Sequence, residues 1–263
     1  MEIFIPADLH STFVILFFVA IAAGLVDAIA GGGGLITVPS MLLLGINPLV
    51  ALGTNRLQAV IGELTACVAF WLNGSIKLKT LGISLVATIV GALLGSFCVS
   101  LLPKQTLQIV LPVLMAAITF YSIFSKRLRQ NIASTPLLSS RSFYLLCGLV
   151  IGFYNGFFGP GTGAIWMLAL VLLLGMMIKQ ATIQTKPLNF IGNVTSLIFF
   201  MGVSSVDYRL GLVMGLGQIL GSILGSYLII KDGDRIVRPV FITVTLLMTL
   251  KLLYKNITQF TVG

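Results

Sequence analysis

The chain has 263 residues, of which 57% are hydrophobic and only 9% are charged, and its mean hydropathy is +1.09. Soluble domains carry roughly 25% charged residues, so this composition excludes a soluble globular protein and predicts a membrane protein. The net charge of +9 is expected to meet anionic lipid headgroups, and it gives no reason to invoke nucleic acid.

Hydrophobic segments along the chain predict an all-α polytopic membrane protein with about ten segments, five in each half. The expected segments are 12–29, 35–53, 57–73, 80–102, 105–125, 142–158, 163–178, 187–203, 209–230 and 237–254. None of them alternates apolar and polar residues as a barrel strand does. Because Glu2 and Asp8 precede the first segment without a Lys or Arg, we expect it to stay in the protein rather than act as a signal peptide.

An internal repeat divides the chain into two halves. The Gly-Ala-Leu-Leu-Gly-Ser stretch at 91–96 matches Gly-Ser-Ile-Leu-Gly-Ser at 221–226, at an offset of 130 positions. An odd number of crossings in each half inverts the second half and predicts a pseudo-two-fold axis in the membrane plane. The expected units of this one membrane domain are a first inverted repeat at 1–125, a basic cytoplasmic linker at 126–141 and a second inverted repeat at 142–263.

The distribution of Lys and Arg among the short loops predicts the orientation. If the N-terminus lies outside, the inner loops hold eleven cations, namely Lys77, Lys79, Lys126, Arg127, Arg129, Arg141, Lys179, Lys186, Lys231, Arg235 and Arg238. The opposite face then holds five, namely Arg56, Lys104, Arg209, Lys251 and Lys255. We therefore expect both termini to lie outside.

Two glycine-dense stretches interrupt apolar segments at matching places in the two halves. The first is Gly31–Gly34, and the second contains Gly159, Gly161 and Gly163. Either stretch would be costly within a continuous helix, so we expect a break at each, as a re-entrant pair or an unwound span. Such breaks are the best sequence pointer to a transporter's binding site, because the freed backbone groups can hold a substrate. The alternative is close helix packing, which explains most isolated GxxxG motifs.

Polar side chains follow each break at equivalent positions. They are Thr54, Asn55, Arg56 and Gln58 in the first half, and Thr185, Lys186 and Asn189 in the second. We expect both clusters to open a helix, where the partial positive charge attracts an anion. The alternatives are that Arg56 and Lys186 extend to the membrane interface, and that Asn55, Thr185 and Asn193 join helices by hydrogen bonds.

Three further polar residues fall within apolar segments: Asp27, Glu63 and Asn155. A carboxylate in the middle of a bilayer costs about 2.5–3.5 kcal/mol, so Asp27 and Glu63 are expected to face protein or a water-filled cavity. Either could be a proton-coupling group or a partner of Arg56. Asp27 matches Asn155 in the repeat, which makes Asn155 a further candidate for the substrate site.

Catalysis and metal binding find little support in the sequence. The single histidine, His10, lacks a second ligand or a triad partner. The three cysteines lie in apolar segments, where small buried thiols are the usual interpretation. We therefore expect no cofactor, no metal and no enzymatic activity.

The motifs resemble those of the TauE/SafE sulfite-exporter family of bacterial membrane transporters, and its YfcA-like branch most closely. The resemblance is carried by residues 24–39, 45–48, 51–59, 152–163, 185–186, 188–190 and 215–218. It implies a secondary carrier of small sulfur-containing or carboxylated anions, such as sulfite, thiosulfate or sulfonates, across the inner membrane. The sequence therefore predicts an alternating-access anion transporter that binds a small anion and lipid, and a homodimer is compatible with its composition. The alternatives are a passive anion channel and, less favoured, an intramembrane enzyme.

Overall fold

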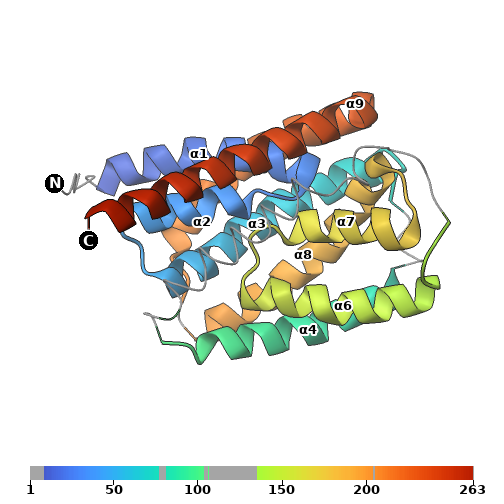
Figure 1. Cartoon of the computed structure of the whole chain (residues 1–263), viewed down its shortest axis with the longest axis horizontal. Coiled ribbons are helices and arrows are strands. Elements are labelled where there is room, and N and C mark those ends of the chain that lie inside the picture. The colour runs from blue at the N-terminus through green and yellow to red at the C-terminus, as the bar shows by residue number, and fades with distance from the viewer. Residues whose placement is uncertain (1–8, 77–80, 104–105, 107–134, 204, 263) are drawn as a thin grey trace.

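The computed structural model describes residues 9–76, 81–103, 106, 135–203 and 205–262. The regular structure of these residues is helical throughout, as predicted. The helices are α1 (Leu9–Ala30), α2 (Gly34–Leu43), α3 (Pro48–Leu72), α4 (Gly82–Ser100), α6 (Ser140–Phe157), α7 (Thr162–Leu174), α8 (Ile178–Gly202) and α9 (Tyr208–Val262). Figure 1 shows them as one elongated bundle in which the start of α1 and the end of α9 lie at the same side.

Helices α1, α4, α6 and α7 lie close to their predicted segments. The segments 209–230 and 237–254 both fall within α9, whose backbone leaves helical geometry at Asp232. The predicted segment 105–125 and most of the linker lie outside the described residues.

The prediction for segments 35–53 and 57–73 is wrong about where one helix ends and the next begins. Helix α2 stops at Leu43 and α3 already starts at Pro48. Gly45 supplies a left-handed turn with φ +79°, and the side chain of Asn47 accepts a hydrogen bond from the Leu49 N–H at 3.0 Å. An Asn cap followed by proline is a strong helix start, so it overrides the later polar cluster.

The second half shows the same difference. Helix α8 begins at Ile178, well before the predicted start at 187, and Pro187 lies inside it. The clusters around Thr54 and Thr185 therefore lie inside α3 and α8, beyond the first turn, where backbone N–H groups are already used by the helix. The expectation that these clusters open a helix is wrong.

Three helical stretches are long and apolar enough to cross a membrane by length and composition, among the residues described. They are Ser11–Ala30, Gly82–Ser100 and Tyr208–Gly233. Helices α3 and α8 have 25 residues each but carry charged residues along their length. By contrast, α2 and α7 are short apolar helices of 10 and 13 residues, or about 15 and 20 Å, so each crosses only part of a hydrocarbon core roughly 30 Å thick.

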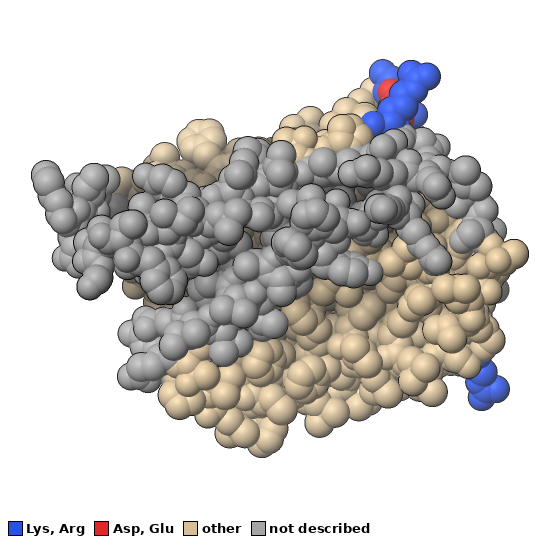
Figure 2. Space-filling model, in the orientation of Figure 1, with Lys and Arg blue, Asp and Glu red and all other residues tan. Residues whose placement is uncertain are grey.

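The connections gather at two opposite ends of the bundle. Figure 1 shows the end of α3, the start of α4, the α7–α8 turn, the start of α6 and the kink of α9 at the right-hand end, away from the start of α1 and the end of α9. Lys179 at the start of α8 donates to the carbonyl of Ile230 at 3.0 Å, which joins two of these connections. On the face shown in Figure 2, the visible Lys and Arg of the described residues also lie at the right-hand end.

The two halves exchange equivalent helix contacts. Helix α1 packs along α9, and α6 packs along α4. Each contact uses glycines: a Cβ on Gly95 would overlap the carbonyl oxygen of Phe153 on α6, and a Cβ on Gly221 would overlap the carbonyl oxygen of Ile21 on α1. Close backbone approach through small residues is how helices pack in a membrane, where apolar burial gives little driving force.

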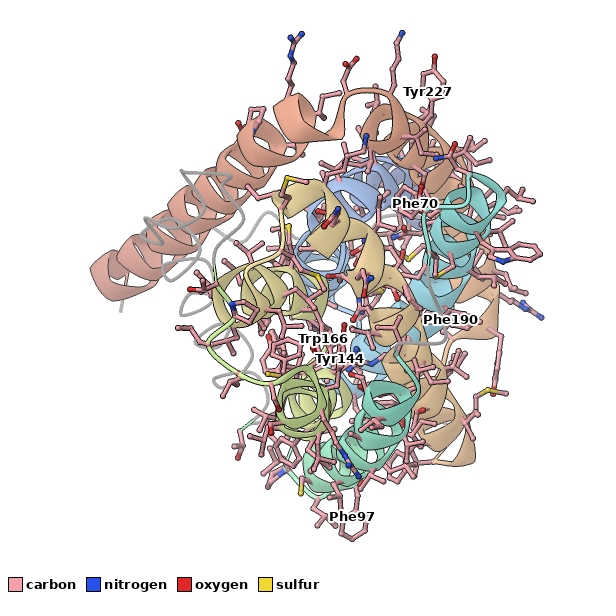
Figure 3. The ribbon with its side chains drawn as sticks, turned by 90° about the vertical axis from the view of Figure 1, so that its right-hand side faces the viewer. Phe70, Phe97, Tyr144, Trp166, Phe190 and Tyr227 are labelled. Carbon is pink, nitrogen blue, oxygen red and sulfur yellow. The ribbon has the colours of Figure 1, made fainter. Side chains whose placement is uncertain are left out.

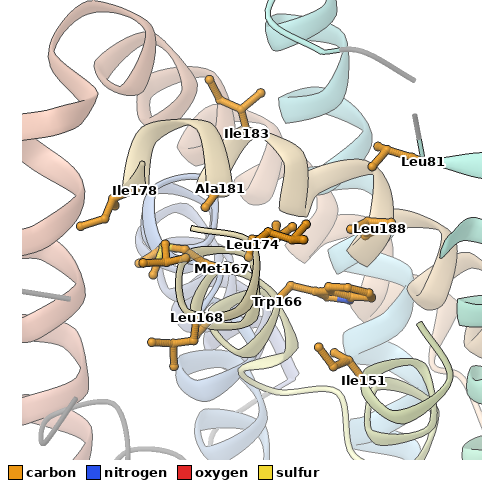
Figure 4. Close-up of a cluster of buried hydrophobic side chains, with 14 of the residues drawn as sticks. Leu81, Ile151, Trp166, Met167, Leu168, Leu174, Ile178, Ala181, Ile183 and Leu188 are labelled. Carbon is orange, nitrogen blue, oxygen red and sulfur yellow. The ribbon is translucent and has the colours of Figure 1, made fainter. Parts of the chain in front are cut away.

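Apolar side chains fill the interior around these contacts. One buried cluster centres on α7 and includes Trp166, Met167 and Leu168, with Leu188 from α8 and Ile151 from α6 (Figure 4). Viewed from the end of the bundle in Figure 3, Trp166 and Tyr144 lie inside. In the same view, Phe97 and Tyr227 point outward, as expected for side chains facing lipid.

The glycine contact between α4 and α6 generates a test. Gly95→Ala should destabilise the protein by on the order of 1–3 kcal/mol, because the new methyl group forces the two backbones apart. Gly82→Ala in the same helix is the matched control, since no atom lies within 4 Å of its Cβ. The measurement is the thermal unfolding midpoint of the detergent-purified protein, and equal midpoints for both variants would contradict the packing argument.

Candidate functional site

Both glycine-dense stretches break a helix, as the sequence predicts. The first separates α1 from α2, with Gly31 at φ +70°. The second separates α6 from α7, with Gly159 at φ +87° and Gly161 at φ +81°. L-residues with a side chain rarely adopt this left-handed conformation, so glycine is required at these three positions.

The structure brings the two breaks into direct contact. The N–H of Ala164 in α7 donates to the carbonyl oxygen of Gly31 at 3.1 Å. A Cβ on Gly31 would overlap the backbone of Gly163, and one on Gly34 would lie 2.9 Å from the Cα of Pro160. Glycines therefore serve here both for backbone conformation and for the approach of one break to the other.

Helices α2 and α7 both begin at this contact, so their N-terminal ends lie together. The Gly33 N–H donates to Asp27 Oδ1 at 3.1 Å. For Gly32, Gly34, Gly161 and Gly163, no acceptor of the backbone N–H is found among the residues that the structure describes. Buried N–H groups are almost always paired in folded proteins, so unpaired donors at the positive ends of two helices favour an anionic ligand.

Arg56 on α3 lies fully buried against the end of α6. Its Nη1 donates to the side-chain oxygens of Asn155 at 3.2 Å and Asn193 at 3.0 Å, and its Nη2 donates to the carbonyl of Asn155. A Cβ on Gly159 would overlap the guanidinium. The cation thus caps the carbonyl end of a helix that stops inside the protein, and within the described residues its Nε has no partner.

Lys186 on α8 does the same for α1. Its Nζ donates to the carbonyl of Asp27 and lies 3.6 Å from Asp27 Oδ2. Lys186 occupies the position in the second half that Arg56 occupies in the first, 130 residues earlier. Each half therefore supplies the cation that caps the broken helix of the other half.

These contacts correct the assignment of Arg56 and Lys186 to loops. Both side chains are 0% exposed, so neither lies at a membrane interface, and that alternative is also wrong. Lys186 therefore leaves the set of cations expected in the inner loops, and Arg56 leaves the set on the opposite face. The inner loops still hold the larger number of cations. Asp27 and Glu63 face protein, as expected, but the expected partners differ, because Asp27 pairs with Lys186 and Glu63 with two amides.

Five side chains form a closed polar ring at the centre of α3, α6 and α8. Beyond the contacts of Arg56, Asn155 Nδ2 donates to Asn189 Oδ1 at 2.9 Å, and Asn189 Nδ2 donates to Glu63 Oε1. Asn193 Nδ2 closes the ring by donating to Glu63 Oε2 at 3.3 Å. Sequence reasoning placed Asn193 among helix-joining residues and left it out of the site, although its match to Glu63 in the repeat was a usable signal.

A second buried network joins α2, α3 and α9. Thr37 Oγ1 and Gln58 Nε2 both donate to Asn55 Oδ1, at 2.7 and 2.8 Å. Gln218 Nε2 donates in turn to Gln58 Oε1 at 2.8 Å. Asn55 Nδ2 also lies beside Gly34 at the first break. The predicted residues Asn55 and Gln58 thus border the break, whereas Thr37 and Gln218 were missed because a single Thr or Gln in an apolar segment is a weak signal.

Two predicted site residues bond elsewhere. Thr54 Oγ1 accepts from the Asp207 N–H at 3.0 Å, at the start of α9. Thr185 Oγ1 donates to the carbonyl of Ala181 in its own helix at 2.9 Å. Among the residues described, no group of three His, Cys, Asp or Glu side chains could hold a metal ion.

The fold and the site define a polytopic helical membrane protein with two broken helices meeting in its interior. Residues 16–252 match the family described as "Sulfite exporter TauE/SafE". The chain is 38% identical over 244 residues to a "Probable membrane transporter protein" of Haemophilus influenzae, covering 91% of this chain and 94% of that protein. It is 36% identical over 242 residues to the "Probable membrane transporter protein YfcA" of Escherichia coli K12, covering 92% and 90%.

A more distant relative is the "Probable membrane transporter protein YjnA" of Bacillus subtilis, 28% identical over 247 residues, which cover 90% of this chain and 96% of that one. No solved structure matches the chain. The chain belongs to the TauE/SafE family of membrane transporters, as the sequence motifs indicated.

The contact between Gly159 and Arg56 generates a second test. Gly159→Ala should lower stability through left-handed strain of about 1–2 kcal/mol and, in addition, displace the guanidinium from the end of α6. Gly45→Ala is the matched control, since its φ of +79° imposes the same strain but no atom lies within 4 Å of its Cβ. Thermal unfolding of the two purified variants gives the comparison. If Gly159→Ala lowers the unfolding midpoint no more than Gly45→Ala does, Arg56 does not stabilise the end of α6.

Proposed function

We propose that the protein is a secondary transporter that moves small sulfite-, thiosulfate- or sulfonate-like anions across the bacterial inner membrane by alternating access. The observation that carries the proposal is the set of unpaired backbone N–H groups at the meeting N-termini of α2 and α7. Helix N-termini bind oxyanions through such groups without an added positive side chain. The substrate class is supported by the family description as sulfite exporters.

The balance of charge around the breaks supports an anion rather than a cation. Arg56 and Lys186 lie beside the two breaks and offset the carbonyl ends of α6 and α1, which would otherwise repel an anion. The partial positive charges at the N-terminal ends of α2 and α7 then remain without an opposite charge to offset them. The site proposed for the anion therefore comprises the glycines of both breaks, with Asn55, Gln58, Asn155 and Asn189 close by.

Alternating access is supported by the exchange of contacts between the halves. The first helix of each half packs on the fourth helix of the other, and each half caps the broken helix of the other. Two inverted units with equivalent contacts can exchange conformations by rocking about a fixed site. A carrier fits this arrangement better than an enzyme, and the relatives are described as transporters.

The binding site itself can be tested with Gly33→Leu and Gly161→Leu. Each should abolish saturable uptake of thiosulfate into proteoliposomes while leaving membrane insertion intact. A Cβ on Gly33 would lie 2.8 Å from the Ala23 carbonyl oxygen and from Asp27 Cβ, and Gly161 has a left-handed φ of +81°, so each leucine displaces the backbone at the start of α2 or α7. Gly32→Ala is the control, since its Cβ meets the nearest atom, Val26 Cγ1, at an ordinary 3.7 Å. Normal transport by both leucine variants would contradict the proposed binding site. Wild-type flux that never saturates would instead indicate a channel.

We also propose that both termini lie outside the inner membrane, because Arg141, Lys179, Lys231 and Arg235 belong to connections at the opposite end. In a variant with its native cysteines replaced, Gly45→Cys should react with an impermeant maleimide added to spheroplasts. Gly74→Cys should react only after the membrane is opened. Both glycines are exposed loop residues with nothing within 4 Å of a Cβ, so the two sites are matched. The reverse pattern would invert the orientation.

A further inference from the structure

All hydrogen bonds in the polar ring are donated in the same sense, from Arg56 toward Glu63. Arg56 donates to Asn193, whose amide donates to Glu63; Arg56 also donates to Asn155, which donates to Asn189, which donates to Glu63. Both routes run from the cation to the carboxylate through amide groups that all point the same way. Arg56 and Glu63 therefore form an ion pair that is transmitted by amides rather than by direct contact.

Glu63 also lies at a special place in the repeat. Asn193 is its equivalent in the second half, 130 positions later, and the two side chains are hydrogen-bonded to each other. A residue can touch its own repeat counterpart only near the axis that relates the two halves. The carboxylate is thus positioned centrally between the two halves rather than within one of them.

The charges around Glu63 cancel. With Glu63 ionised, the form that its two amide donors bind, Arg56 and Lys186 supply two positive charges and Asp27 and Glu63 supply two negative charges. The other titratable groups close to this cluster are Cys67 on α3 and Tyr154 on α6, both of which are ordinarily neutral at pH 7. A buried anion added to a neutral cluster lacks a compensating charge, and an uncompensated buried charge is strongly unfavourable.

The two carboxylates are not equally able to supply that compensation. Asp27 Oδ2 lies 3.6 Å from the Lys186 ammonium, and Asp27 Oδ1 accepts a hydrogen bond from the Gly33 N–H. Glu63 has no direct contact with a cation among the described residues, and only amide N–H groups bind it. Of the two, Glu63 loses less when it is neutralised.

We propose that Glu63 takes up one proton from water when a monovalent anion enters the site, so that the protein carries a proton with its anion. This inference rests on the proposed anion transport and adds its coupling ion. The carboxylate becomes a carboxylic acid, whose O–H needs an acceptor that the present ring does not offer. Reversal of the Asn193 amide supplies that acceptor and withdraws Asn193 Oδ1 from Arg56 Nη1. Protonation of Glu63 thereby frees one N–H of Arg56 Nη1 to bind the anion.

Calorimetry of the purified protein with ethanesulfonate, a monoanion that does not titrate near neutral pH, tests the proposal. Repeating the titration in buffers of different ionisation enthalpy gives the number of protons taken up with each anion. The wild-type protein should take up about one, and its affinity should fall about tenfold for each unit of rising pH once Glu63 is ionised. Glu63→Gln should bind ethanesulfonate without proton uptake and without this pH dependence, because its site is already neutral at that position.

A double variant that exchanges the residues at the two equivalent positions, 63 and 193, distinguishes loss of the carboxylate from general damage to the protein. Glu63→Asn combined with Asn193→Glu moves the carboxylate across the axis and keeps the net charge, so proton uptake should return to about one for each anion. Size-exclusion and thermal unfolding establish that each variant is folded. Binding by wild type without proton uptake, or equal uptake by Glu63→Gln, overturns the inference alone. Failure of the folded wild-type protein to bind both ethanesulfonate and thiosulfate overturns the anion site, and the coupling with it.

Discussion

A helix that ends inside a membrane leaves backbone groups that neither lipid nor its own turns can satisfy, and this constraint organises the whole protein. Helices α1 and α6 both end in the interior, and their last carbonyls are met by Lys186 and Arg56 from the opposite half. Neither half could complete its broken helix alone. The two halves are therefore interdependent at the point where the backbone is least regular.

The same solution explains why the most polar residues lie at the centre. Buried charges are tolerated when each meets a helix end, a counter-charge or an amide, and each of the four central charges does so. At the positive ends of α2 and α7, by contrast, several N–H donors have no acceptor within the described parts of the chain. In the proposed anion site, the cations thus act indirectly, by neutralising carbonyl ends rather than by contacting a ligand.

The two halves have equivalent helices and breaks, but their buried polar side chains differ. Gln58 and Gln218, which join α3 to α9, correspond at the repeat offset to Leu188 and Thr88 in the other half. The second half instead carries the chain of asparagines that leads to Glu63. The two halves thus have equivalent breaks but different polar partners, with glutamines near the first break and asparagines around Glu63.

The sequence by itself determined the features that depend on local energies. Apolar composition required a membrane protein, and clustered glycines required breaks, because backbone strain and helix propensity act within a few residues. The repeat offset alone also relates Arg56 to Lys186. Local signals failed at the helix starts, where Asn47 with Pro48 outweighed the later polar cluster and Pro187 proved compatible with a helix.

Only the tertiary structure decided which groups each polar side chain meets. Lys186 and Asp27 lie 159 positions apart, and Arg56 and Asn193 lie 137 apart, so no local pattern relates them. An arginine in an apolar segment is compatible with a loop, an interface or a buried cap, and the choice depends on what the rest of the chain places around it. Long-range packing supplied that environment: it made Arg56 and Lys186 helix caps and joined the carboxylate of Glu63 to Asn189 and Asn193 of the other half.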